Sequence, residues 1–140
     1  MPKIKILFIE DDSDQIFLYQ TKFKLEGYDF ISAKDGAEGL RLAEKEKPDL
    51  ILLDILLADE NGIDILKNLT NNKKTKSIPV IVFTNFDKEE INKQAVALGA
   101  VGYVIKSKVV PSEIVKKVAE VLRLSGKEFG KKVPQGKIGL

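Results

Sequence analysis

The chain contains neither cysteine nor histidine, and these two absences exclude several kinds of chemistry. Without cysteine there are no disulfides and no thiolate nucleophiles. Without histidine there is no imidazole base for a catalytic triad, and with both residues missing a zinc site of the usual Cys/His type is excluded. The reactive groups must therefore come from carboxylates, hydroxyls, amides and amines.

Long apolar segments are also missing. The sequence has no apolar run of transmembrane length and no charged-then-apolar leader, so we expect a cytoplasmic protein. Its 140 residues and 44% hydrophobic content suit one domain with a hydrophobic core. Of the net charge of +2, residues 126–140 carry +3 and residues 1–125 carry −1. We therefore expect a near-neutral body that binds neither nucleic acid nor membrane, and a basic, poorly ordered tail.

Short apolar runs alternate with amphipathic segments along the chain, which is typical of a parallel α/β sheet. Unbroken apolar runs indicate strands that helices cover on both faces. Strands are expected at residues 6–9, 28–33, 50–53, 80–83 and 103–105. The run at 28–33 is the most mixed in character, so we expect it at an edge of the sheet.

Five helices are expected after these five strands. They are predicted from Ser13 to about Glu26, from Asp35 to just before Pro48, from Asn61-Gly62 onward, from Asp87 to Gly99, and from Pro111 onward. Asp35 with Glu38, and Asp87 with Glu90, match the capping-box pattern of a helix start. The alternation predicts a doubly wound five-stranded parallel sheet of strand order 2-1-3-4-5, flanked by five helices over residues 4–125.

Polar side chains follow four of the apolar runs, where strands of the sheet would end. They are Glu10-Asp11-Asp12, Asp54, Thr84 and Lys106. Ligands of open parallel sheets bind outside the carboxyl ends of the strands, so these residues should meet in space. Adjacent acids suit Mg²⁺, a carboxylate can attack phosphorus, and a hydroxyl and an ammonium can bind phosphoryl oxygens. The cluster predicts a phosphoryl-transfer site, with Asp12 or Ser13 capping the next helix.

These segments resemble the receiver domain of two-component response regulators over residues 4–125. The resemblance rests on residues 6–12, 48–54 with Gly62, 79–84 and 99–106, in family order and spacing. It implies that Asp54 is the phosphoacceptor and that Thr84 and Lys106 bind the phosphoryl oxygens. It also implies Mg²⁺ ligation by Glu10, Asp11, Asp54 and the Leu56 backbone carbonyl.

The same resemblance implies a switch and partners. Thr84 and Tyr103 would change position on phosphorylation and alter the surface of the fourth helix, fifth strand and fifth helix, where a downstream protein would bind. Because the chain lacks histidine, its phosphodonor would be a histidine kinase or a histidine phosphotransfer protein. The chain would catalyse its own phosphorylation and dephosphorylation while acting mainly as a stand-alone signalling switch. The sequence leaves open whether phosphorylation drives dimerisation.

Three positions depart from the usual receiver pattern. Ala58 and Ser107 stand where the family usually has proline, and Asn85 stands where it favours a small residue. We expect Asn85 to narrow access to the phosphoryl group and the Lys106 loop to be positioned differently. We also hypothesise that the apolar side chains of Leu56 and Phe86 hinder the hydrolytic water.

Other readings of the same residues fit less well. A phosphatase of the haloacid dehalogenase type needs a second acid where Leu56 stands, and a nucleotide-binding P-loop is absent from the sequence. A flavodoxin-type loop would bind phosphate where Glu10-Asp11-Asp12 repels it. The remaining alternative is a phosphorylation-independent interaction module of the same fold. We favour the phosphorylatable form because the acids, the threonine and the lysine are all present.

Overall fold

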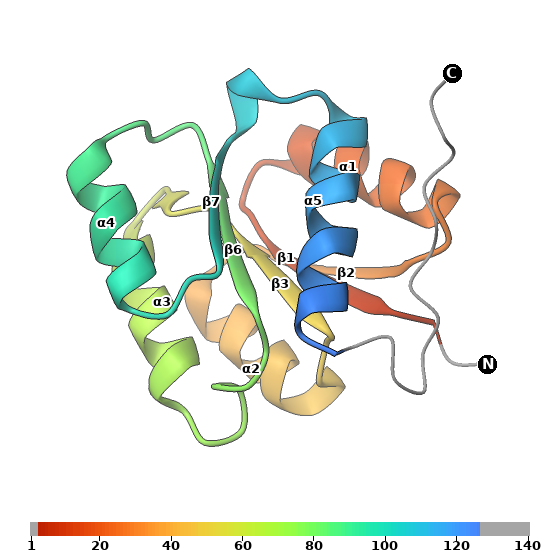
Figure 1. The fold of residues 1–140 in the computed structure, drawn as a ribbon. Helices are drawn as coiled ribbons and strands as arrows, with labels where there is room; N and C mark the ends of the chain where they lie inside the picture. The colour runs from red at the N-terminus through yellow and green to blue at the C-terminus, as the bar shows by residue number, and fades with distance from the viewer. Residues whose placement is uncertain (1–2, 127–140) are drawn as a thin grey trace.

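The structure, a computed structural model, describes residues 3–126 as a five-stranded parallel sheet with helices on both faces (Figure 1). The strands of the sheet are β1 (Lys5–Ile9), β2 (Asp29–Ala33), β3 (Leu50–Leu53), β6 (Val80–Thr84) and β7 (Gly102–Ile105). Their order is β2-β1-β3-β6-β7, which confirms the predicted order 2-1-3-4-5 and the edge position of the second strand. The flanking helices are α1 (Ser13–Leu25), α2 (Gly36–Glu46), α3 (Gly62–Asn71), α4 (Glu89–Ala97) and α5 (Pro111–Leu124).

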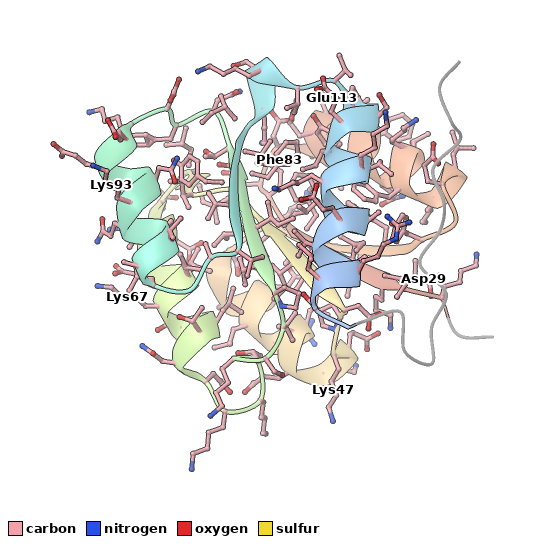
Figure 2. The ribbon with its side chains drawn as sticks, viewed as in Figure 1. Asp29, Lys47, Lys67, Phe83, Lys93 and Glu113 are labelled. Atoms are coloured by element: carbon pink, nitrogen blue, oxygen red, sulfur yellow. The ribbon has the colours of Figure 1, made fainter. Side chains whose placement is uncertain are left out.

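Successive side chains of each strand point to opposite faces of the sheet and divide the core into two layers. Phe8 and Phe83 belong to the layer that packs against α1 and α5. Leu7 and Val82, their neighbours along the strands, belong to the layer against α2, α3 and α4. Figure 2 shows Phe83 inside the molecule. Each unbroken apolar run therefore packs alternate side chains into the two core layers on opposite faces of the sheet.

The start of α1 follows the prediction, whereas the start of α4 does not. Asp12 caps α1, and its carboxylate accepts hydrogen bonds from the N–H groups of Asp14 and Gln15. The predicted capping box of Asp87 is wrong, because α4 has Lys88 at its N-cap and no side-chain cap. The Asp87 carboxylate instead forms an ion pair of 2.8 Å with the ammonium of Lys108. Lys108 is far away in sequence, so a local pattern could not reveal this competition.

A short hairpin between β3 and α3 was not expected from the sequence. It consists of β4 (Leu56–Leu57) and β5 (Glu60–Asn61), which pair antiparallel. Strands of two residues are too short to show any hydrophobic periodicity. The Glu60 carboxylate accepts a hydrogen bond of 2.9 Å from the N–H of Gly36, so the hairpin is fastened to the start of α2.

Two expectations concern the ends and location of the protein. The predicted basic tail of residues 126–140 lies, beyond Gly126, outside the described residues, and the domain limits of 4–125 stay a prediction. Within residues 3–126 no helix combines the length and the apolar character needed to cross a bilayer. The cytoplasmic location also stays a prediction.

The hairpin turns into α3 at a glycine that has no room for a side chain, and this gives a stability prediction. A Cβ atom on Gly62 would lie 2.2 Å from the Cα of Ile55, whereas a Cβ on Gly102 would meet nothing nearer than 3.6 Å. We expect Gly62→Ala to lower the free energy of unfolding by about 2 kcal/mol or more, because backbone must move to accept it. Gly102→Ala is the matched control, with an expected change within about 1 kcal/mol. Urea denaturation measures both, and equal losses would contradict the prediction.

Candidate functional site

The four polar clusters predicted from the sequence meet at one edge of the sheet. Glu10 follows β1, Asp54 follows β3, Thr84 ends β6 and Lys106 follows β7. The N–H of Asp54 donates a hydrogen bond of 3.0 Å to the carbonyl of Ile9, which holds the ends of β1 and β3 together. Backbone pairing of the parallel strands therefore sets the positions of the functional side chains.

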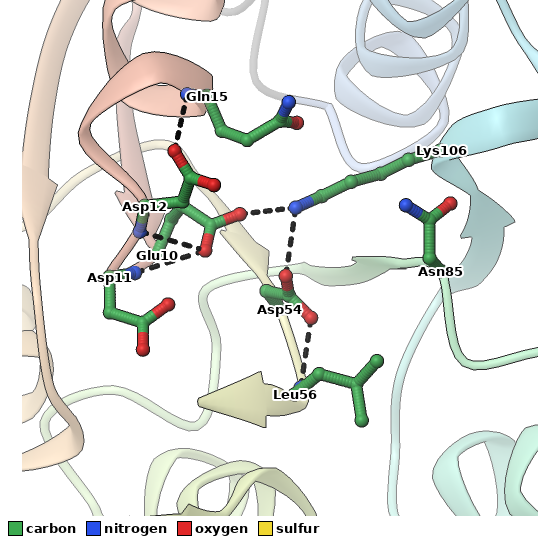
Figure 3. Close-up of a pocket in the computed structure, with 8 residues that line it drawn as sticks. All are labelled: Glu10, Asp11, Asp12, Gln15, Asp54, Leu56, Asn85 and Lys106. Atoms are coloured by element: carbon green, nitrogen blue, oxygen red, sulfur yellow. Dashed lines mark hydrogen bonds and ion pairs between the residues drawn. The ribbon is translucent and has the colours of Figure 1, made fainter. Parts of the chain in front are cut away.

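A cavity of about 230 Å³ opens at this edge (Figure 3). It is lined by Glu10, Asp11, Asp12, Gln15, Asp54, Leu56, Asn85 and Lys106. Thr84 is fully buried and is not among the lining residues. The sequence prediction missed Gln15, which lies in the first turn of α1 directly after the acids.

Lys106 is the buried cation of the site. Its ammonium donates hydrogen bonds to the Asp54 carboxylate, at 2.8 Å, and to the Glu10 carboxylate. It also lies 5.7 Å and 5.8 Å from the ring centroids of Phe8 and Phe83. Burial alone would lower the pKa of this ammonium, but the two carboxylates raise it above its ordinary value. Lys106 is therefore charged at neutral pH.

Asp54 is buried but ionised. Burial favours the neutral acid, but the Lys106 ammonium, the N–H of Leu56 and the hydroxyl of Thr84 together hold its pKa below the ordinary value. The bond from the N–H of Leu56 to the carboxylate is 2.9 Å long. A carboxylate that is ionised and oriented in this way can act as a nucleophile without a separate base.

Glu10 has the opposite electrostatic situation. It is 1% exposed, and burial raises its pKa to about 7, with a further contribution from the charge of Asp54. The bond to Lys106 opposes this rise, but one ammonium is shared between two buried carboxylates and cannot fully stabilise both. The second oxygen of Glu10 accepts from the N–H groups of Asp11, at 3.0 Å, and Asp12, at 3.3 Å.

The hydroxyl groups of Thr84 and Tyr103 both form hydrogen bonds with the backbone of Phe86. The hydroxyl of Thr84 accepts a hydrogen bond of 3.2 Å from the N–H of Phe86. The hydroxyl of Tyr103 donates a hydrogen bond of 2.5 Å to the carbonyl of the same Phe86. The two predicted switch residues thus hold one peptide segment from both sides. Sequence reasoning did not predict this role for Phe86, because both bonds use its backbone.

The acids of the site fit a divalent cation by charge and by ligand type. Glu10, Asp11 and Asp54 line the cavity with hard oxygen ligands, and Lys106 is the ammonium set against these three carboxyl groups. Within residues 3–126 no group of three His, Cys, Asp or Glu side chains is arranged as a ready metal site. Mg²⁺ keeps several waters and needs only one or two carboxylates, so the residues fit this ion. The predicted ligand roles, including that of the Leu56 carbonyl, stay predictions.

Comparison with known proteins identifies the family that these residues match. The model of the response regulator receiver domain matches residues 6–119. The chain is 38% identical over 121 residues to the alkaline phosphatase synthesis transcriptional regulatory protein PhoP of Bacillus subtilis. This match covers 86% of the chain but only 49% of PhoP, so the chain spans about half the length of that relative. It is 31% identical over 102 residues to the protein PilH of Pseudomonas aeruginosa, covering 73% of the chain and 84% of PilH.

A solved structure gives the same result. The chain superimposes on a CheY-like response regulator receiver domain protein from Methanospirillum hungatei with a TM-score of 0.83 and 28% sequence identity. The superposition covers 91% of this chain and 99% of the other.

The raised pKa of Glu10 predicts how the metal-free protein responds to pH. The pKa of this carboxyl is about 7 in the folded state against 4.5 ordinarily, so the folded state binds more protons between these values. We therefore expect the free energy of unfolding to fall by roughly 2 kcal/mol as pH rises through this window. Asp54 does not contribute there, because its lowered pKa acts only below its ordinary value of 3.8.

The check is urea denaturation across this window in the presence of a chelator, for the parent and for Glu10→Gln. The variant cannot ionise at this position and should lose most of the decline. An identical decline in both proteins would show that another group causes it.

Proposed function

The chain belongs to the response regulator receiver domain family, and on this premise we propose that it accepts a phosphoryl group on Asp54 from a phosphohistidine of a partner protein. The observation that carries the proposal is the Asp54 carboxylate itself. It is held 2.8 Å from the Lys106 ammonium at a cavity that opens to solvent, with its pKa lowered. The donor is a sensor histidine kinase or a histidine phosphotransfer protein, because this chain has no histidine.

The transfer needs one bond to form and one to break. An oxygen of the Asp54 carboxylate attacks phosphorus as the phosphorus–nitrogen bond breaks, and the donor leaves as an imidazole that takes up a proton. Lys106 and Thr84 stabilise negative charge on the phosphoryl oxygens as these approach Asp54. Both side chains already contribute to the lowered pKa of that carboxyl. The group formed is an acyl phosphate.

The acids of the cavity support Mg²⁺ as the cofactor of this transfer. Glu10, Asp11 and Asp54 would hold the ion, with the Leu56 carbonyl as a further ligand. Bound there, it would screen the repulsion between the acceptor carboxylate and the incoming phosphoryl group. The hydrogen bonds that the Glu10 carboxylate accepts from the N–H groups of Asp11 and Asp12 would hold it in position for the ion.

The backbone of Phe86, which bonds to both Thr84 and Tyr103, supports a path from the site to the surface. When the Thr84 hydroxyl turns to a phosphoryl oxygen, the N–H of Phe86 loses its acceptor. The segment is then free to move and to carry its carbonyl away from the Tyr103 hydroxyl. Tyr103 belongs to β7, so the change reaches the surface of α4, β7 and α5. A downstream protein recognises this surface, on which Val96 and Val101 are exposed.

The central test is the intact mass of the protein after incubation with acetyl phosphate and Mg²⁺. We expect the parent to gain one phosphoryl group, because acetyl phosphate supplies the same electrophile as phosphohistidine. Asp54→Asn lacks the nucleophile and should gain none, and a chelator should abolish the gain in the parent. A folded parent that gains nothing with Mg²⁺ present would favour the phosphorylation-independent interaction module instead.

The position of Leu56 predicts the lifetime of the phosphorylated state. Its side chain lines the cavity, is 50% exposed, and offers no hydrogen bond to a water that would attack the acyl phosphate. We expect Leu56→Asn to accelerate dephosphorylation roughly tenfold, because an amide can orient that water. Leu56→Met keeps the side chain apolar and should keep the parental rate. Intact mass recorded over time measures the rate at which each variant loses the phosphoryl group. Equal rates for Leu56→Asn and the parent would contradict this hypothesis.

A further inference from the structure

Asn85 lines the cavity, and neither the sequence nor the family resemblance gives it a chemical role. It follows Thr84 directly at the end of β6 and faces Lys106 and Asp54 across the cavity (Figure 3). Its side chain is exposed, so the fold does not need it for packing.

The orientation of the Asn85 amide follows from its bond to Ser107. The side-chain oxygen of Asn85 accepts a hydrogen bond of 2.8 Å from the backbone N–H of Ser107. A backbone N–H can only donate, so the amide atom that it contacts must be the oxygen and not the nitrogen. The bond therefore fixes which end of the amide faces the loop after β7.

The amide nitrogen is left on the other side. Figure 3 shows it turned toward Lys106 and Asp54, with the oxygen turned away from them. Among residues 3–126 this nitrogen has no hydrogen-bond partner. A neutral donor with two hydrogens thus faces the cavity in which the phosphoryl group would be carried.

We propose that the side-chain amide of Asn85 donates a hydrogen bond to the phosphoryl group on Asp54, and that the N–H of Ser107 orients it for this purpose. The inference rests on the proposed function, because it needs Asp54 to be phosphorylated. A phosphoryl group presents three acceptor oxygens, and the proposed function already gives two of them side-chain donors in Lys106 and Thr84. Asn85 adds a donor without adding charge to the cavity.

Ser107 is a positioning residue that acts through its backbone. Proline at this position would have no N–H, so the Asn85 oxygen would lose its donor and the amide would be free to turn. The chain thus has both residues that this hydrogen bond needs: an amide at position 85 and a residue with a backbone N–H at position 107.

The rate of acyl phosphate formation from acetyl phosphate with Mg²⁺ tests the proposal. We expect Asn85→Ala to slow this rate about fivefold to tenfold, because a hydrogen bond to developing negative charge is lost. Asn85→Asp has the same size and keeps an oxygen for the N–H of Ser107, but it replaces the donor by an acceptor. It should be slowed at least as much. Asn68→Ala, on the exposed face of α3 away from the cavity, is the matched control and should keep the parental rate.

A purely steric role for Asn85 predicts the opposite sign. If the amide only narrowed the entrance, Asn85→Ala would react faster than the parent. That result would overturn the proposal. A parent that gains no phosphoryl group would overturn the proposed function as well, so the two failures are distinguishable.

A double-mutant cycle tests the positioning role. Ser107→Pro should slow the parent, but should cause no further loss when added to Asn85→Ala, because the amide that it orients is already gone. Full additivity of the two losses would overturn the role of Ser107. Urea denaturation of each variant separates these rate effects from unfolding, and if Ser107→Pro does not fold, the Asn85 variants alone decide the proposal.

Discussion

The structure of the site depends on the ammonium of Lys106, a single buried cation shared by two buried carboxylates. Burying Glu10 and Asp54 near each other costs solvation and repulsion, and the ammonium between them offsets much of both. The three groups come from the ends of three strands, so the ion pairs also join the carboxyl ends of β1, β3 and β7. Removing the ammonium would leave two buried charges without a partner.

One cation does not fully balance two carboxylates, and this imbalance links stability to function. Asp54 is held ionised by Lys106, Leu56 and Thr84 together, whereas burial leaves Glu10 with a raised pKa. The carboxylates of the site therefore repel one another in the folded protein, and a divalent cation bound between them would reduce this repulsion. The same excess of negative charge would attract a cation to the cavity, and the Mg²⁺ proposed above would favour the entry of a phosphoryl group.

The sequence predicted the residues that the backbone positions and missed the contacts that side chains make across loops. Glu10, Asp54 and Lys106 follow apolar runs, and the parallel sheet brings the ends of such runs together whatever the details of the loops. The cap of α1 was predictable because Asp12 bonds to N–H groups within three residues. The cap of α4 was not, because Lys108 binds Asp87 from another loop.

The same distinction explains why two departures from the receiver pattern gain a role only in three dimensions. Ala58 and Ser107 each have a backbone N–H that proline would lack. The first donates to the carboxylate of Asp11 at 2.9 Å, and the second donates to the amide of Asn85 at 2.8 Å. Both acceptors line the cavity, Asp11 beside Glu10 and Asn85 on the side of Lys106.

Each of these bonds joins two loops that are far apart in sequence, so the rim of the cavity is held by the backbone at two points. A proline would hold its own loop rigid through its ring but would leave the facing side chain without a donor. In this chain the N–H groups of Ala58 and Ser107 instead donate to side chains that line the cavity. The two bonds orient the Asp11 carboxylate and the Asn85 amide, which line the same cavity.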